Sequence, residues 1–378
     1  MSPYHIPFNK PAIVGKEIEY ILQSVHEGHI SGDGPFTKQC HQLLQSTLGV
    51  KKALLTTSCT HALEMAALLL NIQPGDEVIV PSFTFVSTVN AFVLRGARPI
   101  FIDIRPDTLN LDERLLEKLI TKRTKAILPV HYAGVGCDMD TIGALGEKYN
   151  LPVVEDNAHG LYGKYKGRWL GTFGVMSTLS FHETKNFNCG EGGALIINDE
   201  KYIEQAEILR EKGTNRSRFF RGQVDKYTWV SVGSSYLPSD LLAAYLFAQL
   251  EEKDQIITNR RRVFETYAER LQYWAAANNI RMPIIPPECD QSYHMFYILL
   301  PSLEKRTQLI NHLKSRGILS VFHYLPLHLS PMGLQWGYKT GDCPVTEDVS
   351  DRLLRLPFYN SLTPEEQEEV CKMIIKVV

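Results

Sequence analysis

The chain has 378 residues, of which 44% are hydrophobic and 22% charged, and its formal net charge is -2. This composition is typical of a soluble globular protein, and the length suggests about two domains. The near-neutral charge predicts no nucleic-acid or anionic membrane partner, and no apolar run approaches the length of a membrane span. The seven cysteines are dispersed without a paired spacing. We therefore expect reduced thiols, no metal site and a cytoplasmic protein.

The first half of the chain predicts a large α/β unit. Prolines at positions 3, 7 and 11 predict an extended arm, and helices are expected over 15–28 and 36–48. From residue 53 strands and helices alternate, which predicts a mainly parallel sheet covered by helices. The expected strands are 53–56, 77–80, 99–104, 126–130, 153–155 and apolar runs near 175–181 and 194–197. Helices are expected at 57–70, after Phe85 to near Gly96, at 112–120 and at 138–149.

The second half predicts a smaller α+β unit. A helix is expected at 201–212, followed by an arginine-rich and aromatic stretch, 213–233, with no core pattern. Such a long stretch is expected to be a functional loop, a partner contact or a mobile segment. Helices at 238–252 and 254–278 lead to a proline-rich boundary near residue 285. The remaining expected elements are a strand at 294–300, a helix at 303–316, a strand at 320–324 and a helix from 363.

Lys185 is the first candidate for chemistry, because it lies between two apolar runs that both predict buried strands. A lysine near the core must be paired, exposed or chemically used, since an isolated buried ammonium is costly. Desolvation lowers a lysine pKa from about 10.4 and makes the amine a usable nucleophile for an aldehyde. The alternative is a solvated loop lysine, with the glycines of 190–193 serving only the turn.

Other polar groups are expected at the same edge of the sheet. Ligands gather at the carboxyl ends of parallel strands, where 57–60, 83–85, 131–132 and 156–159 are predicted to lie. Glu155 and Asp156 point to opposite faces, so only one can face this edge. An aspartate could hold a protonated ring nitrogen, Phe85 could stack on the ring, and Thr60 and Ser180 could hold a phosphate. With the lysine, these groups describe a pocket for pyridoxal phosphate. Helix capping at 57–60 and core packing of Phe85 are the simpler alternatives.

At this point the sequence resembles a known family, the pyridoxal phosphate (PLP)-dependent sugar aminotransferases of the DegT/DnrJ/EryC1/StrS family. The resemblance covers nearly the whole chain. It implies an α/β protein with the PLP-dependent transferase fold of type I (aspartate aminotransferase-like). It divides the chain into an arm and large PLP-binding domain, 1–255, and a small C-terminal domain, 256–378, reached through a long helix. The motifs are Pro81-Ser82-Phe83-Thr84-Phe85, Val154-Glu155-Asp156-Asn157-Ala158-His159, Ser180-Phe181-His182-Glu183-Thr184-Lys185-Asn186, Gly190-Glu191-Gly192-Gly193 and His323-Tyr324-Leu325-Pro326-Leu327-His328.

The resemblance also implies roles for cofactor-binding residues. Lys185 matches the lysine that forms the Schiff base and shuttles the proton, Asp156 the partner of the pyridine nitrogen, and Phe85 the stacking ring. The phosphate-holding positions are Ser58, Cys59, Thr60 and Ser180. His159 stands where the family often has glutamine, so it is expected either to bind the ring hydroxyl or to be a structural histidine. Relatives often supply an asparagine to the phosphate across a dimer, and here Ser235 or Tyr236 would replace it.

On the substrate side, His323, Tyr324 and His328 match a segment near the nucleotide sugar. Arg216 and Arg221 belong to a loop suited to a diphosphate, from either subunit of a homodimer, with a solvated surface loop as the alternative. Within the family, the resemblance carried by the runs 211–217 and 219–229 narrows the expected reaction further. It implies transfer of an amino group from L-glutamate to C4 of dTDP-4-keto-6-deoxy-D-glucose, giving dTDP-4-amino-4,6-dideoxy-D-galactose for a surface polysaccharide such as enterobacterial common antigen or O-antigen.

Three alternatives stay open at this stage. The first is the same chemistry with other stereochemistry or at C3. The second is a non-catalytic regulator that binds a sugar nucleotide, and the third a PLP enzyme that acts only on amino acids. The family's sugar dehydratases are disfavoured, because they carry histidine where this chain has Lys185.

Overall fold

A computed structural model describes residues 4–377, and its centre is a twisted sheet of two joined parts. The four-stranded part has the order β1 (Lys52–Thr56), β9 (Gly193–Ile197), β8 (Met176–Ser180) and β5 (Val154–Asp156). The three-stranded part has the order β3 (Arg98–Ile102), β2 (Glu77–Pro81) and β4 (Thr124–Ile127). Parallel bridges from Ile127 to Val153 and from Val130 to Asp156 join β4 to β5.

The sheet is mainly parallel, as predicted, with one exception. Strand β9 is antiparallel to both β1 and β8, while the β5–β8, β2–β3 and β2–β4 pairs are parallel. The exception has a simple cause. The 12 residues that connect β8 to β9, 181–192, form a hairpin-like loop and not a helical crossover, so the chain returns in the opposite direction.

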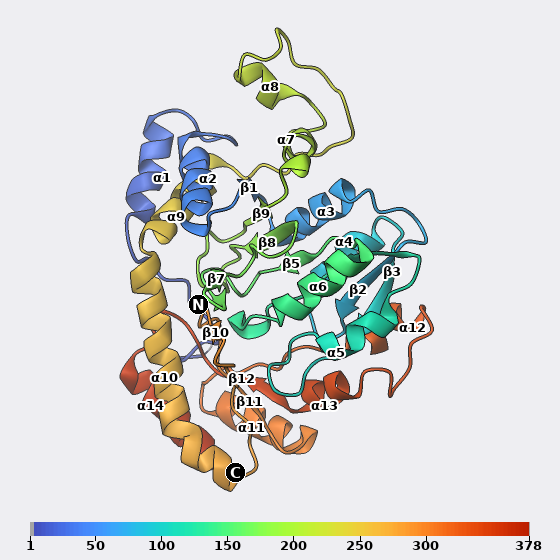
Figure 1. The fold of residues 1–378 in the computed structure, drawn as a ribbon. Helices are drawn as coiled ribbons and strands as arrows, with labels where there is room; N and C mark the ends of the chain where they lie inside the picture. The colour runs from blue at the N-terminus through green and yellow to red at the C-terminus, as the bar shows by residue number, and fades with distance from the viewer. Residues whose placement is uncertain (1–3, 378) are drawn as a thin grey trace.

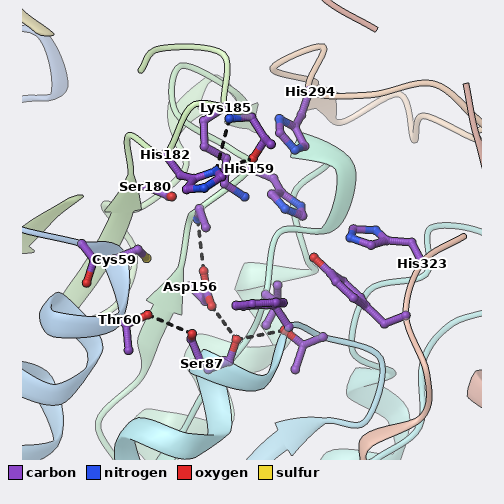
Figure 2. Close-up of a pocket in the computed structure, with 18 of the residues that line it drawn as sticks. Cys59, Thr60, Ser87, Asp156, His159, Ser180, His182, Lys185, His294 and His323 are labelled. Carbon is purple, nitrogen blue, oxygen red and sulfur yellow. Dashed lines mark hydrogen bonds between the residues drawn. The ribbon is translucent and has the colours of Figure 1, made fainter. Parts of the chain in front are cut away.

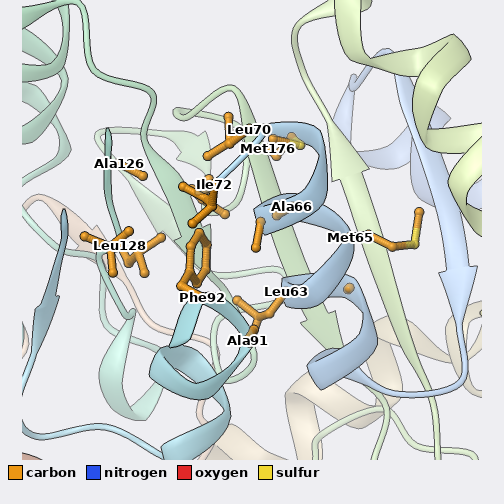
Figure 3. Close-up of a cluster of buried hydrophobic side chains, with 14 of the residues drawn as sticks. Leu63, Met65, Ala66, Leu70, Ile72, Ala91, Phe92, Ala126, Leu128 and Met176 are labelled. Carbon is orange, nitrogen blue, oxygen red and sulfur yellow. The ribbon is translucent and has the colours of Figure 1, made fainter. Parts of the chain in front are cut away.

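Helices cover both faces of this sheet (Figure 1). On one face α3 (Cys59–Leu69), α4 (Val86–Val93) and α7 (Ile203–Arg210) share a core with Val78, Val80 and Met176 (Figure 3). On the other face α2 (Pro35–Leu48) and α9 (Asp240–Glu251) pack on alternate residues of β1, β8 and β9. Helices α5 (Glu113–Leu116) and α6 (Met139–Tyr149) cover β2 and β4 there. This alternation is what a sheet buried on both sides requires.

The C-terminal part has its own core. The long helix α10 (Lys253–Ala277) contributes Ile256 to a core of the large sheet, but its residues from Val263 onward pack with the C-terminal elements. This distribution supports the division near residue 255 that we propose. The C-terminal elements are β11 (Tyr297–Leu299), α11 (Leu303–Ser315), α12 (Pro331–Leu334), α13 (Pro344–Arg352), β12 (Leu353–Arg355) and α14 (Pro364–Ile375).

One sequence prediction for this part needs correction. The expected strand at 320–324 is reduced to a single bridge between Val321 and Arg355. Strand β11 pairs instead with β12, a strand that was not predicted, antiparallel over three residues. An isolated three-residue strand carries too short an alternation to be recognised, and its last residue is an arginine.

The N-terminal arm and a small sheet tie the chain together. The arm is described from Tyr4, so Pro3 lies outside the described residues, and Ile6 forms a parallel bridge to Ile318. Helix α1 (Glu17–His26) follows the arm and packs on α9. A three-stranded sheet of β6 (Lys164–Tyr165), β7 (Arg168–Trp169) and β10 (Cys289–Asp290) lies where the chain enters the C-terminal part.

The stretch predicted as a loop without a core pattern forms a protruding loop, defined here as residues 212–235. It contains one short helix, α8 (Arg216–Phe220), and Figure 1 shows it projecting beyond α7, away from the rest of the chain. Its aromatic side chains are largely exposed: Trp229 is 77% and Phe220 is 70% accessible. Within the described residues, no helix is long and apolar enough to cross a membrane.

Candidate active site

A cavity of about 610 Å³ opens at the carboxyl ends of the central strands (Figure 2). Each side of it comes from the residues that follow a strand: 58–60 after β1, 84–88 after β2, Asp156 and His159 at the end of β5, and Ser180 at the end of β8. Segment 322–325 and Arg355 of the C-terminal part close the opposite side. The size is in the range of pockets that hold a cofactor or small ligand.

Lys185 lies in the loop between β8 and β9 and reaches this cavity. Backbone bonds hold the loop: the N–H of Phe181 donates to the carbonyl of Gly192 at 2.8 Å, and the N–H of Lys185 to the carbonyl of His182 at 2.9 Å. Burial lowers the pKa of the lysine to about 8, and Arg355 acts in the same direction, while Asp156 opposes it. Its amine is therefore much more often neutral at physiological pH than an ordinary lysine.

The two carboxylates at the end of β5 separate as strand geometry predicts. Glu155 points away from the cavity, where it contacts His131 Nε2 at 2.8 Å and accepts the backbone N–H groups of Gly171, Phe173 and Gly174 at 2.7 Å each. Asp156 points into the cavity. Its Oδ2 accepts from the Thr88 hydroxyl at 2.7 Å, and its Oδ1 from the N–H of Ala158 at 3.1 Å. Asp156 is thus the carboxylate available to a ligand.

One end of the cavity has the character of an anion site. Helix α3 starts there, and the N–H groups of Cys59 and Thr60 have no hydrogen-bond partner among the residues that the structure describes. The capping role weighed for this stretch falls to Ser58, whose hydroxyl accepts from the N–H of His61 at 3.1 Å. Free N–H groups and the helix dipole favour a bound phosphate.

A glycine allows strand β9 to pass close to this helix start. A Cβ at Gly193 would lie 2.4 Å from the Ser58 carbonyl carbon and from the Cys59 nitrogen. Thr60 donates to the Ser87 hydroxyl at 2.8 Å, and Ser180 lies on the same side of the view as Cys59 and Thr60, away from His323 (Figure 2). Any side chain at position 193 would displace the helix start and with it the anion site.

The other end of the cavity is lined by histidines. The rings of His159 and His294 stack with their centroids 4.1 Å apart, and the His323 ring lies 6.2 Å from that of His159. Burial lowers the pKa of all three well below the usual histidine value, so they are neutral at pH 7. His159 Nδ1 is buried without a hydrogen-bond partner among the described residues. A ligand group with a hydroxyl would satisfy it.

Phe85 and Tyr324 are two neighbouring aromatic residues that line the cavity. Phe85 precedes α4, lines the cavity and is 58% exposed, so the core-packing alternative does not hold for it. Tyr324 lies with its ring centroid 6.3 Å from that of Phe85. An exposed ring at the wall of a pocket is available to stack on a planar ligand.

Four predicted residues do not line the cavity. His328 is fully buried, with Nδ1 2.6 Å from the Ser82 hydroxyl and Nε2 3.0 Å from Glu347. The expectation that it contacts substrate is corrected, because both ring nitrogens are used inside the protein: Nδ1 ties the C-terminal part to Ser82 after β2, and Nε2 contacts Glu347 of α13. Ser235, Arg216 and Arg221 lie on the protruding loop, where the two arginines pair with Glu211 and Glu207 at 2.8 Å.

The cavity residues that sequence reasoning missed include Thr88, His294 and Arg355. Thr88 holds Asp156, and His294 stacks on His159 while its Nδ1 contacts the Asn186 amide oxygen at 2.9 Å. The signal for Arg355 was present, because it is a single cation inside the apolar run 353–358. A charged side chain within an apolar run that is predicted to be buried indicates a specific partner or ligand.

Comparison with known proteins identifies the fold and chemistry. Residues 11–375 match the model of the DegT/DnrJ/EryC1/StrS aminotransferase family. The chain belongs to this family. Its curated relatives include the spore coat polysaccharide biosynthesis protein SpsC of Bacillus subtilis, 32% identical over 383 residues that cover 99% of this chain and 97% of that protein. They also include the GDP-perosamine synthase of Escherichia coli O157:H7, 33% identical over 374 residues and 98% of both chains.

Solved structures match nearly the whole length of the chain. The putative sugar aminotransferase Spr1654 of Streptococcus pneumoniae, in its PMP form, has a TM-score of 0.92 and 28% identity, and the match covers 99% of both chains. Its PLP form matches with a TM-score of 0.90. The predictions of a type I fold, of a PLP-dependent sugar aminotransferase and of pyridoxal phosphate as cofactor are confirmed. A purely non-catalytic role is therefore set aside.

The residues of the cavity fit this cofactor. The unpartnered N–H groups of Cys59 and Thr60 suit its phosphate, Asp156 its ring nitrogen, and the orphaned Nδ1 of His159 its ring hydroxyl. When bound, pyridoxal phosphate supplies an aldehyde that bonds to amines and a ring that withdraws electrons from the adjacent carbon. In this cavity Lys185 Nζ would provide the amine and carry the proton, and Asp156 would keep a proton on the ring nitrogen.

Proposed function

We propose that the enzyme transfers an amino group from L-glutamate to C4 of dTDP-4-keto-6-deoxy-D-glucose, giving dTDP-4-amino-4,6-dideoxy-D-galactose for a surface polysaccharide. The choice of a nucleotide sugar as substrate is supported by the combination of a sugar aminotransferase pocket with a protruding loop that bears arginines. Guanidinium groups bind the oxygens of a diphosphate well, and Arg216 and Arg221 are both partly exposed. The runs 211–217 and 219–229, which support the C4 assignment, lie on and beside this loop.

We also propose that two chains assemble so that the protruding loop of one reaches the pocket of the other. Within one chain the loop leaves its apolar side chains uncovered, with Trp229 77%, Phe220 70% and Val232 63% exposed. Large exposed aromatics on a projecting segment are typical of a surface that a partner covers. Ser235 stands at the base of the loop and is exposed, so it is free to approach a phosphate held by a second chain.

A GDP-linked sugar is the second candidate substrate, and one observation favours it. A relative with 33% identity over 98% of the chain is named GDP-perosamine synthase. The base and the diphosphate lie away from the reacting carbon, so the chemistry of Lys185 and Asp156 is the same for both. The preference for a dTDP- or a GDP-linked sugar therefore depends on the protruding loop and on the surface that it contacts in a second chain.

The experiment compares acceptors under identical conditions. Purified enzyme with pyridoxal phosphate and ¹⁵N-labelled L-glutamate would be given the dTDP-, UDP- and GDP-linked 4-keto-6-deoxy sugars in turn, and ¹⁵N incorporation followed by mass spectrometry. We expect kcat/KM to be at least about 100-fold higher for the dTDP sugar, the range that a site with specific polar contacts achieves. A preference for the GDP sugar would replace the proposed substrate and keep the reaction class.

A further inference from the structure

His294 is a buried ring of the cavity wall, and its hydrogen bonds fix where its proton lies. It is held by Asn186, the residue that follows Lys185 in the chain. Asn186 Nδ2 donates to the carbonyl of Ser292 at 2.7 Å, which sets the amide so that its oxygen faces the ring. Because an amide oxygen only accepts, His294 Nδ1 carries the proton and donates it to Asn186 Oδ1 at 2.9 Å.

The second ring nitrogen of His294 is therefore an acceptor that faces the cavity. Burial lowers the pKa of His294 well below the usual histidine value, and His159 and Lys185 act in the same direction. A neutral imidazole has one ring proton, and here it is on Nδ1, so Nε2 has a free lone pair. Nε2 has no hydrogen-bond partner among the described residues and, unlike His159 Nδ1, it is not enclosed by protein. Since His294 lines the cavity, this accessible atom is open to a ligand there.

The segment that carries this ring, 292–294, is held in place from several sides. The N–H of Ser292 donates to the carbonyl of Gly134 at 3.1 Å, and its hydroxyl donates to the carbonyl of His159. The carbonyl of His294 accepts from Arg260 Nη2 at 2.6 Å. The His294 ring stacks on that of His159 with an angle of 17° between their planes. An acceptor fixed in this way discriminates between ligand groups, because it cannot turn to present a donor.

The place of His294 in the cavity is beside the reacting groups. Figure 2 shows its ring next to that of His159, on the side of the Lys185 loop. The bond to Asn186 ties it to the residue that directly follows Lys185. The phosphate-binding end, at the start of α3, is on the other side of the view (Figure 2). A group bound at Nε2 is therefore near the catalytic loop and away from the cofactor phosphate.

The chemistry of an acceptor nitrogen distinguishes the two proposed substrates. Besides its reacting amine, L-glutamate offers two carboxylates at neutral pH, and these only accept hydrogen bonds. A lone pair on Nε2 repels such groups and attracts a hydroxyl. In the proposed keto sugar, the reacting carbon C4 has one neighbouring carbon that bears a hydroxyl, and this carbon is C3. The C3 hydroxyl is thus the donor closest to the reacting carbon.

We propose that His294 Nε2 accepts a hydrogen bond from the C3 hydroxyl of the keto sugar, with Asn186 and Ser292 holding the ring in the tautomer that makes this possible. The inference rests on the proposed function, since it assumes a keto sugar with a hydroxyl beside its carbonyl. It makes that hydroxyl a requirement for a good acceptor, whichever nucleotide the sugar carries.

The experiment removes the sugar hydroxyl and the ring nitrogen separately and together. The holoenzyme would be given ¹⁵N-labelled L-glutamate with dTDP-4-keto-6-deoxy-D-glucose or its 3-deoxy or 2-deoxy derivative, and kcat/KM for ¹⁵N transfer measured in wild type, H294N and H294Q. Asparagine can still donate to Asn186 but has no atom at the place of Nε2, whereas glutamine returns an amide group there. H26N is the control, because it removes an exposed histidine of α1 that does not line the cavity.

The ratio of kcat/KM between the 3-hydroxyl and 3-deoxy sugars decides the matter. We expect about 10- to 100-fold in wild type and H26N, about threefold or less in H294N, and an intermediate ratio in H294Q. Each protein meets the same change in carbonyl reactivity, and a general loss of activity in a variant cancels in its ratio, so the difference between ratios isolates the contact.

The 2-deoxy sugar tests which hydroxyl is bound. The proposal expects the ratio between the 2-hydroxyl and 2-deoxy sugars to be the same in wild type and H294N. An unchanged 3-deoxy ratio in H294N would overturn the proposal, and so would a change confined to the 2-deoxy ratio.

A binding measurement removes any dependence on turnover. Without an amino donor, a keto sugar binds the aldehyde form of the holoenzyme and is not aminated, so calorimetry gives its Kd directly. The Kd of the 3-deoxy sugar should exceed that of the 3-hydroxyl sugar by about tenfold or more in wild type, and the two should agree within about threefold in H294N. The same Kd ratio in both proteins would refute the inference alone. A sugar that binds but gains no ¹⁵N in wild type would refute the proposed function alone.

Discussion

The lowered pKa of Lys185 gives the most quantitative prediction. Burial brings it from 10.5 to about 8. At pH 7.4, a pKa of about 8 leaves roughly 20% of the amine neutral, against roughly 0.1% for an ordinary lysine near 10.5. The cavity therefore raises the reactive fraction of the amine by roughly 200-fold. The direction of the pKa shift follows from the charge. Desolvation disfavours the charged ammonium, so Lys185 loses its proton at a lower pH than an ordinary lysine.

Two substitutions should move this pKa in opposite directions. Arg355 lowers the pKa of Lys185, so Arg355→Gln should raise it. Asp156 raises that pKa, so Asp156→Asn should lower it further. If Lys185 were a solvated loop lysine, the simpler alternative from the sequence, its pKa would change little in either variant.

The assay is competitive acetylation of the cofactor-free protein over pH 6 to 11, read by mass spectrometry of the peptide that contains Lys185. Lys51 is an internal reference, because its ion pair with Glu200 raises its pKa above the usual lysine value. The reasoning predicts a midpoint near 8 for Lys185. A midpoint as high as that of the reference lysine, or shifts of the same sign in the two variants, would refute it.

Three further predictions concern other parts of the chain. Asp156→Asn should retain cofactor and lose about 100-fold or more in kcat, because a neutral amide no longer stabilises a proton on the ring nitrogen; unchanged kcat would mean that another group does so. His328→Phe should lower the free energy of unfolding by about 1–3 kcal/mol in urea titrations and leave the sugar KM unchanged, because the substitution removes the hydrogen-bond partner of Ser82 and Glu347. A large change in the sugar KM without a loss of stability would contradict this structural role. Trp229→Ser should weaken self-association about tenfold or more in sedimentation experiments if the protruding loop is an interface, and an unchanged association constant would remove it from that interface.

The parts of the site that could be predicted from the sequence are those carried by short local patterns. Asp156 ends β5 and Lys185 lies in the loop that follows β8, so both are expected at the edge of the sheet where the parallel strands end. The alternation of side chains along β5 then turns Asp156 and not Glu155 toward the site. The start of α3 follows the same logic, because a serine before a helix is a capping signal and the next N–H groups are free. The resemblance to a known family then supplied the cofactor.

The remaining cavity residues depend on contacts between distant segments. His294 and Arg355 reach the cavity only because the C-terminal part folds back against the strand ends, and Arg355 is positioned by Phe8, more than 340 residues earlier in the chain. No local sequence pattern predicts such contacts between segments that are far apart in the chain. The same holds for His328, whose motif predicted a substrate contact although its two nitrogens are used within the core.

The residues of the protruding loop pose a different problem. Ser235 and the loop arginines lie outside the cavity of their own chain, so their predicted roles depend on a second copy. Charge and aromatic content marked the segment as unusual, and its exposure agrees with a partner surface. A single chain does not determine which side chains approach the ligand.

The most direct test of the account is an NMR spectrum of the sugar formed from ¹⁵N-labelled L-glutamate and dTDP-4-keto-6-deoxy-D-glucose by the holoenzyme. The account predicts one new amine, on C4, with small couplings from H4 that show it to be axial, and no product from Lys185→Ala. An equatorial amine, or an amine on C3, would contradict the proposed product. No ¹⁵N in the sugar, despite conversion of the cofactor by glutamate, would contradict the proposed acceptor altogether.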